Sequence, residues 1–335
     1  MDSLTHIVLG ACIGEIFIGR KTGRRALLMG AVAQSIPDID FVTSFWMPAS
    51  DNLLAHRGFT HSILFVLLMT PLLSWLADKW RRPHDVAFKT WLLFFGAELF
   101  THLALDTANA YGTGWLEPFS HQRFSYHALF VADPLFSIFP GIATVFLVFF
   151  KRHRRRKHWA AIAIGWCACY LGISLINKAI IESAIVSITR EQGIEYRRHF
   201  TTPTPLNNLL WYVVLEDDNG YYTGYRSVFD SKHRQELYYF PRNDSLTLQV
   251  NDLDELHKLQ RFSQHYYTIE KSGDSLVFND LRFGQMNGWN NPRAGFVFHY
   301  FLKQPGSNDM VIQRGRFSGW NKAVIASLWR RIKGN

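Results

Sequence analysis

The sequence predicts a membrane α-helical domain over residues 1–184, with about six hydrophobic segments, followed by a soluble, mostly β (α+β) domain over residues 185–335. Two observations support this fold class. The long apolar runs fall almost entirely in the first 184 residues. The rest of the chain is polar, rich in Tyr, Asn and Asp, and holds no apolar run long enough to cross a bilayer.

A membrane-spanning helix needs about 20 mostly apolar residues. Four segments come close to this length: Ser62–Ala77, Ala87–Leu105, Ala128–Phe150 and Trp159–Ile181. Two shorter segments, Leu4–Ile18 and Ala26–Ile36, are expected to form a helical hairpin that is thin, tilted or partly buried in protein. Whether these two cross the bilayer fully is left open by their length.

The distribution of basic residues predicts the orientation. The connections after the first, third and fifth segments hold 13 Lys and Arg, whereas those after the second and fourth hold only Arg57 and Arg123. The positive-inside rule places the first set in the cytoplasm. The loops 37–61 and 106–127 and the C-terminal domain then lie on the opposite side. The net charge of +9 is concentrated at 151–158, between two apolar segments, so it indicates topology rather than nucleic-acid binding.

Ionisable residues gather at the predicted non-cytoplasmic ends of the segments. Buried charges are costly in a bilayer, so such residues in apolar segments usually mark a functional site. The candidates are Asp2, His6, Asp38, Asp40, His56, His61, Glu98, His102 and Asp106. The topology was derived from Lys and Arg alone, so the common location of these groups supports a single site.

The spacing of three candidates suggests different roles. Glu98, His102 and Asp106 lie four residues apart and form one stripe along a helix. Glu98 is then about 12 Å deeper than Asp106, too far for one ion to touch both. His102 and Asp106 can share an ion more easily, which leaves Glu98 as a partner of a ligand or as a catalytic base.

Imidazole and carboxylate ligands together predict a divalent metal, with zinc favoured and manganese possible. A ligand set this large could hold two ions, which suits the cleavage of phosphoesters. The alternative is structural. Any one buried histidine can simply bond a neighbouring helix, and Asp38 and Asp40 can be turn residues after Pro37.

Four short motifs in order, DSLTH (2–6), PDID (37–40), HRGFTHS (56–62) and THLALD (101–106), resemble the YdjM-like family of membrane-bound, metal-dependent hydrolases. The resemblance covers about residues 1–184. It implies an inner-membrane protein with a metal site made from Asp2, His6, Asp38, Asp40, His56, His61, His102 and Asp106. The HxxxD at 102–106 is also similar to a ligand pair of the helical zinc phospholipases C and P1-type nucleases.

The C-terminal domain has strand signals from Asn208 onward. A hairpin is predicted with Asn219-Gly220 in its turn. The predicted strands are Asn208–Leu215, Tyr221–Phe229, Leu237–Phe240, Leu246–Val250, Tyr266–Glu270, Ser275–Phe278, Gly295–Leu302 and Met310–Arg316, with helices at Asp252–Gln264 and Asn321–Ile332. The last helix is amphipathic and is expected to pack on the sheet rather than on lipid headgroups.

These observations predict a metal-dependent hydrolase in a bacterial inner membrane, with the C-terminal domain on the periplasmic or extracellular side. The expected substrate is a phosphoester or other ester of a lipid, or a lipid-linked or small molecule. Glu98, or a carboxylate not bound to metal, would act as acid or base. Two alternatives remain: a metal or proton transporter, and a membrane-anchored β binding module without catalysis.

Overall fold

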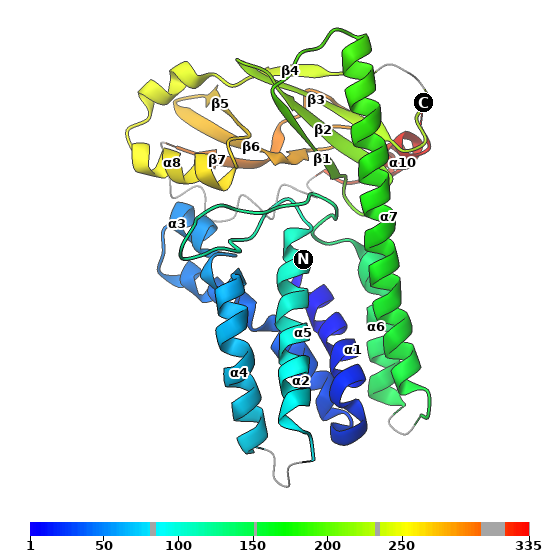
Figure 1. Ribbon diagram of the computed structural model, residues 1–335. Coiled ribbons are helices and arrows are strands. Elements are labelled where there is room, and N and C mark those ends of the chain that lie inside the picture. Colours follow the sequence, from blue (N-terminus) through cyan, green and yellow to red (C-terminus); the bar gives the residue numbers. More distant parts are fainter. Residues whose placement is uncertain (81–84, 151–152, 232–234, 303–318, 335) are drawn as a thin grey trace. The chain divides into compact units, whose positions relative to one another are not determined.

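The computed structural model describes residues 1–80, 85–150, 153–231, 235–302 and 319–334 (Figure 1). The chain divides into two compact units. The first comprises Met1–Phe45 and Ala55–Ile173, and the second comprises Trp46–Leu54 and Ser174–Asn335. The division at Ser174 and the predicted boundary at residue 184 both fall within one helix, α7 (Arg156–Glu191).

Each of the six predicted apolar segments forms a helix. They are α1 (Ser3–Thr22), α2 (Arg25–Ser35), α4 (Ile63–Trp80), α5 (Phe88–Thr107), α6 (Pro134–Phe149) and α7. Among the described helices, α1, α4 and α7 are long and apolar enough to cross a membrane, and α6 is apolar but shorter. A helical region with up to three candidate spans is therefore established, whereas six crossings remain a prediction.

Three short elements in the first half of the chain connect these helices. The 3₁₀ helix η1 (Pro37–Phe45) follows α2, α3 (Ala49–Ala55) comes next, and the 3₁₀ helix η2 (Phe59–His61) directly precedes α4. The segment 108–133 links α5 to α6, and its backbone is hydrogen-bonded to the end of α5 through Tyr126 and Ala128. The carbonyl oxygen of Trp115 in the same segment accepts from Ile63, the first residue of α4, so the segment joins the start of α4 to the end of α5.

Glycines allow α1 and α2 to pack with their backbones in contact. A Cβ atom at Gly10 would lie 2.4 Å from the carbonyl oxygen of Gly30, and one at Gly30 would lie 2.0 Å from the carbonyl oxygen of Gly10. A Cβ at Gly14 would lie 2.2 Å from the carbonyl oxygen of Ala26. Small residues permit such close approach of helices in membranes. The hairpin predicted for the first two segments is therefore a tightly packed pair.

A buried ion pair joins α1 to α7 within the first unit. Arg156 donates from Nε to Glu15 Oε1 at 2.9 Å and from a terminal nitrogen to Glu15 Oε2 at 2.7 Å. The same guanidinium also donates to the carbonyl oxygens of Leu147 and Phe150. A bidentate pair with further hydrogen bonds satisfies both charges away from water. The sequence placed Arg156 in a basic loop, but it is the first residue of α7.

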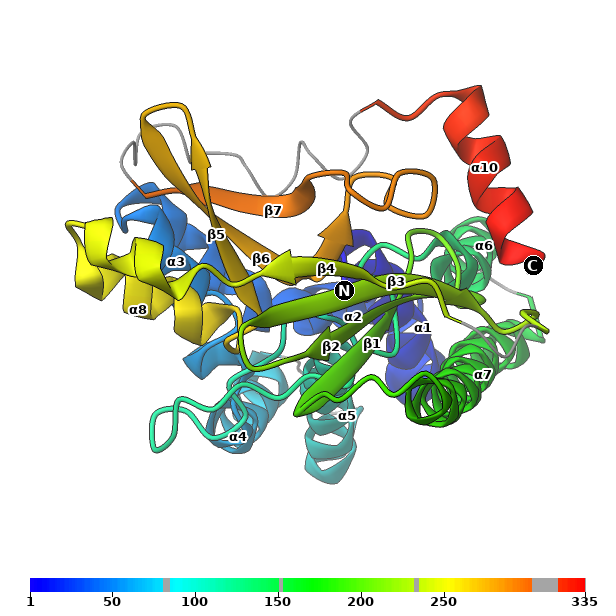
Figure 2. The same ribbon diagram turned by 90° about the horizontal axis from the view of Figure 1, so that it is seen from above.

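The second unit contains two antiparallel sheets (Figure 2). The first has the order β1-β2-β3-β4 and the second has the order β5-β6-β7. The strands are β1 (Arg198–Pro203), β2 (Leu210–Glu216), β3 (Gly220–Ser227), β4 (Tyr238–Pro241), β5 (Tyr267–Ser272), β6 (Ser275–Gln285) and β7 (Phe296–Phe301). Helices α8 (Leu253–Phe262) and α10 (Lys322–Ile332) complete the unit, with a 3₁₀ helix η3 (Asp244–Gln249).

Strand β2 is buried on both faces. Trp211, Val213 and Leu215 pack with Ile181 and Ile185 of α7. The alternate residues Leu210, Tyr212 and Val214 belong to a second cluster that includes Leu328 and Ile332 of α10. This explains why the strand is a continuous apolar run. It also confirms that α10 packs into the core of the unit.

Most of the predicted strands are present, including the hairpin of β2 and β3, but two details differ. The strand predicted at Leu246–Val250 is wrong, because Asp244–Gln249 forms a 3₁₀ helix after Asn243, whose φ is +60°. Strand β1 was not predicted, since it is a polar edge strand that pairs only with β2. The predicted strand at Met310–Arg316 lies outside the described residues.

Candidate metal centre

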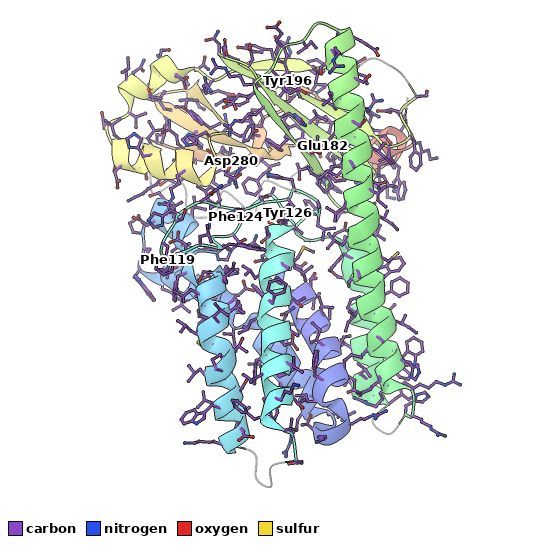
Figure 3. The ribbon with its side chains drawn as sticks, viewed as in Figure 1. Phe119, Phe124, Tyr126, Glu182, Tyr196 and Asp280 are labelled. Carbon is purple, nitrogen blue, oxygen red and sulfur yellow. The ribbon has the colours of Figure 1, made fainter. Side chains whose placement is uncertain are left out.

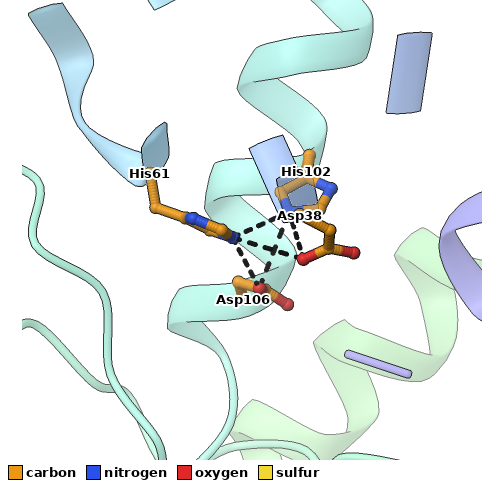
Figure 4. Close-up of side chains that lie close together, drawn as sticks. All are labelled: Asp38, His61, His102 and Asp106. Atoms are coloured by element: carbon orange, nitrogen blue, oxygen red, sulfur yellow. Dashed lines mark hydrogen bonds and ion pairs between the residues drawn. The ribbon is translucent and has the colours of Figure 1, made fainter. Parts of the chain in front are cut away.

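Four side chains of the first unit converge at one end of its helices (Figure 4). Asp38 comes from η1, His61 from η2, and His102 and Asp106 from the last turns of α5. One ligand atom from each lies within 4.8 Å of all the others. His61, His102 and Asp106 are fully buried, whereas the side chain of Asp38 is 23% exposed. The cluster therefore opens to its surroundings at Asp38.

The four atoms are Asp38 Oδ1, His61 Nε2, His102 Nε2 and Asp106 Oδ2. Asp38 Oδ1 is 3.6 Å from each Nε2 atom. Asp106 Oδ2 is 3.3 Å from His61 Nε2 and 3.6 Å from His102 Nε2. The two Nε2 atoms are 3.0 Å apart. Two imidazoles and two carboxylates in such a group are a ligand set that suits a divalent metal.

The hydrogen bond on the far side of the His102 ring determines which ring nitrogen carries the proton and which presents a lone pair to the cluster. His102 Nδ1 is 2.6 Å from the backbone carbonyl oxygen of Gln34. A carbonyl oxygen only accepts hydrogen bonds, so Nδ1 carries the proton. In the neutral ring Nε2 is then unprotonated and available to bind a metal.

Asp40 has the same effect on His61. His61 Nδ1 is 3.1 Å from Thr60 Oγ1, whose own proton goes to Asp40 Oδ2, and 3.2 Å from Asp40 Oδ2 itself, so Nδ1 carries the proton. Two unprotonated nitrogens therefore face each other at 3.0 Å, which is repulsive unless a cation lies near both. Asp106 Oδ2 is buried and, within the described part of the chain, accepts no well-aligned hydrogen bond. These features fit a metal ion, since it would satisfy all three atoms.

Asp40 itself is held from several directions. It accepts hydrogen bonds from the backbone nitrogen of Arg57 at 2.8 Å and from Thr60 Oγ1 at 3.0 Å, and His56 Nδ1 lies 2.9 Å from its Oδ1. The structure thus places Asp40 and His56 behind His61 rather than in the group of four. A carboxylate on the outer nitrogen of a ligating histidine fixes its ring and raises its basicity.

Both aspartates of η1 are ionised in this environment. Burial raises the pKa of the Asp38 carboxyl, but His102 and His61 lower it by more, so its pKa lies well below the ordinary value. Burial likewise raises the pKa of Asp40, and His56 and His61 outweigh it and bring its pKa well below the ordinary value. Burial lowers the pKa of His56, and Asp40 only partly offsets this. Two carboxylates with low pKa values therefore lie beside the imidazoles of the cluster, a combination that favours a cation.

His6 and Asp2 occupy other positions around the cluster. The His6 ring stacks on His102 with the ring centres 3.9 Å apart, and its Nε2 is 3.1 Å from Asp106 Oδ1. The amino group of Met1 contacts the same oxygen. Asp2 caps α1 by accepting from the backbone nitrogen of Thr5. Neither residue belongs to the group of four, and direct ligation by them remains a prediction.

Glu98 lies one helical turn before His102 and is completely buried. Neither of its carboxylate oxygens has a hydrogen-bond partner among the residues that the structure describes. One of them lies 2.9 Å from the position that a Cβ atom on Gly30 would take. Glu98 is outside the group of four. Its catalytic role stays a prediction.

Arg57 is a site residue that sequence reasoning did not select. Its Nε is 3.0 Å from Asp106 Oδ2, although the geometry is not that of a hydrogen bond. Its Nη1 donates to Asn109 Oδ1 at 2.8 Å. It is buried and has a φ of +60°, which is uncommon for a residue other than glycine. Its position within HRGFTHS, on the side with very few basic residues, was the available signal.

We predict that Asp40→Asn weakens metal binding by about 10–100-fold without abolishing it. Mutation of the residue that holds a ligating histidine usually has an effect of that size. Competition with a chromophoric chelator measures the affinity. The same titration on Asp2→Asn tests whether Asp2 only caps α1 or also binds the metal. A helix cap leaves the affinity unchanged, whereas a ligand lowers it strongly. An unchanged affinity in Asp40→Asn would contradict the arrangement described around His61.

Comparison with known proteins agrees with this arrangement of motifs. The model of the YdjM inner membrane protein family matches residues 1–181, which is more than half of the chain. The chain belongs to the YdjM family. The matched region includes all four residues of the cluster and each of the other candidates named above. The family resemblance inferred from the motifs is confirmed, together with membership of an inner membrane protein family.

Two curated relatives of this YdjM family member extend the comparison. The inner membrane protein YbcI of Escherichia coli (strain K12) is 32% identical over 123 residues, which cover 36% of this chain and 69% of the relative. YfhP of Bacillus subtilis (strain 168) is 30% identical over 242 residues, covering 67% of this chain and 68% of the relative. No solved structure gives a significant match.

Proposed function

We propose that this YdjM family member is a metal-dependent hydrolase that cleaves a phosphoester, or another ester, of a lipid or lipid-linked substrate at the non-cytoplasmic membrane surface. The observation that carries the proposal is the buried group of four ligand atoms, in which both histidines present an unprotonated nitrogen. A divalent ion held by Asp38, His61, His102 and Asp106, with zinc favoured, would supply an activated water and polarise the bond to be cleaved.

Arg57 supports an anionic substrate. Its guanidinium is positioned beside Asp106 by Asn109 and by the ring of Tyr111, whose centre is 4.8 Å away. A planar guanidinium pairs well with phosphate oxygens and keeps its charge at any relevant pH. In the proposed reaction it binds and orients the anionic group and stabilises the charge that develops on it.

The surroundings of Asp38 support an amphiphilic substrate. Ile39 and Phe41 on the same short helix are more than half exposed, and so is Phe45. Phe119 and Tyr126, labelled in Figure 3, are also exposed and come from the segment between α5 and α6. The exposed apolar side chains of η1, which carries the ligand Asp38, would contact the chains of a lipid while its headgroup reaches the cluster. Glu98 is the proposed acid or base.

The transporter alternative rests on a different observation. Glu98 and Gln34 are buried inside the helix group, and their side-chain oxygens and the Gln34 amide nitrogen have no hydrogen-bond partner within the described ranges. Such groups could line a polar path. The bidentate pair of Glu15 and Arg156, by contrast, is satisfied by its own contacts. We therefore keep transport as the second candidate.

The test uses full-length protein in lipid nanodiscs, stripped with a chelator and reloaded with zinc or manganese. The substrates are bis(p-nitrophenyl) phosphate, a p-nitrophenyl carboxylic ester, phosphatidic acid and a polyprenyl diphosphate, with products identified by mass spectrometry. We expect metal-dependent turnover of at least one phosphoester and its loss in Asp38→Ala. Arg57→Lys should retain metal but lower turnover by about 10²–10³-fold, the usual size for one charge-stabilising group.

Two results would overturn the proposal. One is a metal-loaded protein that releases no product above the level of Asp38→Ala from any of these substrates. The other is metal-dependent uptake of zinc into proteoliposomes by a protein without hydrolytic activity, which would establish transport instead.

A further inference from the structure

A pocket of about 780 Å³ lies in the second unit, against strand β3. Its walls come from β3, the segment 235–238, the turn after β6, the end of α7 and helix α10, all of which belong to that unit. The size falls within the range of small-molecule sites. The pocket shares no residue with the metal centre.

Aromatic rings and amides dominate the lining. Tyr225, Tyr238 and Trp289 contribute aromatic side chains, and Tyr222 joins the lining from the other face of the sheet. Gln192, Gln235 and Gln285 contribute amide groups. The amide nitrogens of Gln235 and Gln285 already donate to backbone carbonyl oxygens, so their amide oxygens are left to accept hydrogen bonds. This combination offers flat apolar surfaces beside neutral hydrogen-bonding groups.

One amide has an acceptor that the described residues leave unsatisfied. Gln192 donates from Nε2 to the carbonyl oxygen of Gln235 at 3.4 Å, which sets the orientation of its amide. Its Oε1 is buried and has no hydrogen-bond partner in the described part of the chain. A buried acceptor without a partner is costly, and a hydroxyl group of a ligand would satisfy it.

The charges of the lining disfavour an anionic ligand. Arg331 is paired with Asp230 through two contacts of 2.7 and 2.8 Å, so its charge is neutralised within the pocket wall. Glu236 adds a further carboxylate to the lining. A phosphate or carboxylate would meet this carboxylate, whereas a neutral ligand would not.

Backbone packing disfavours an extended peptide. Peptides commonly bind a sheet by pairing with a free strand edge. Here β4 pairs with β3 from Gly220 to Thr223, and a Cβ atom at Gly224 would lie 2.6 Å from the carbonyl oxygen of Glu236. The chain therefore covers this edge of β3 with its own backbone, and side chains remain to recognise a ligand.

We propose that this pocket binds a neutral glycan, with the aromatic rings contacting the C–H faces of sugar rings and the amide oxygens accepting hydrogen bonds from hydroxyl groups. Gln192 Oε1 accepts one of these hydroxyl protons. The site is independent of the metal centre and would give the second unit a binding activity of its own, towards an oligosaccharide or the sugar portion of a larger molecule.

The test is calorimetric titration of full-length protein in nanodiscs, because common alkyl maltoside detergents carry a sugar themselves. The probes are chitotetraose, maltotetraose and, for the peptide alternative, tetra-alanine. We expect saturable binding of at least one oligosaccharide with a Kd below about 1 mM. Tyr238→Ala and Gln192→Ala should each raise that Kd at least about tenfold.

Trp329→Ala is the matched control. Trp329 lies on α10, two residues before the wall residue Arg331, but it is exposed and does not line the pocket. Its Kd should equal that of the unchanged protein. The proposal is overturned if neither oligosaccharide binds at up to about 10 mM, if only tetra-alanine binds, or if Trp329→Ala weakens binding as much as the two pocket variants.

Discussion

Alanine at His61 or His102 is expected to remove the metal from the purified protein. Each imidazole supplies one of four clustered ligand atoms, and its outer nitrogen is already engaged by Asp40 or by the carbonyl oxygen of Gln34. Changes to such outer partners alone weaken metal binding by about 10–100-fold, so loss of the ligand itself should exceed this range. Elemental mass spectrometry should find at least one equivalent of zinc or manganese in the unchanged protein and almost none in either variant.

His121→Ala is the matched control for this measurement. His121 comes from the same predicted side of the membrane, but its side chain is 62% exposed and pairs with Glu117 at 2.8 Å. Its removal should leave the metal content unchanged. Gel filtration and circular dichroism show whether each variant is folded. A protein without metal, or one whose metal content is the same in all three variants, would contradict the metal centre.

The substitution Gly30→Ala is expected to destabilise the first unit strongly. The added Cβ would lie 2.0 Å from the carbonyl oxygen of Gly10 and 2.9 Å from Glu98 Oε1. The first of these is backbone, which cannot rotate away. Overpacking usually costs about 1–3 kcal/mol, and we expect the upper end. That loss corresponds to a fall of roughly 5–10 °C in the apparent Tm.

The control for this substitution is Gly165→Ala in α7, where an added Cβ meets no atom within 4 Å. It should leave the apparent Tm unchanged or raise it slightly, because alanine favours a helix. Thermal unfolding followed by circular dichroism compares the two variants in one detergent. Equal Tm values would show that α1 and α2 do not pack through their glycines.

The general architecture could be predicted from the sequence because it depends on composition. All six apolar segments form helices, since long apolar runs have few other stable forms in a membrane environment. The strands of the second unit were largely predictable from alternation and turn residues. The error at Leu246–Val250 arose because an alternating pattern does not exclude a local 3₁₀ turn with its own hydrogen bonds.

The members of the site were predictable as a group but not in their separate positions. Asp38 and Asp40 are two residues apart on a 3₁₀ helix with three residues per turn, so their side chains point in different directions. One joins the cluster and the other supports His61. Sequence spacing does not reveal that a segment is 3₁₀ rather than turn or α-helix. Arg57 was missed for a similar reason, because its left-handed backbone is invisible in sequence.

The ligands of the cluster are distant in the chain, and this has a consequence for the unfolded protein. His61 and His102 are 41 residues apart, and Asp38 precedes both. The three cysteines are free, so no disulfide restricts the described chain. An ion bound by all four residues would act as a cross-link, closing loops of tens of residues. By analogy with disulfides, such closure reduces the entropy of the disordered chain by an amount equivalent to about 3–4 kcal/mol. The metal would then stabilise the fold by cross-linking the helix ends, in addition to its part in the reaction.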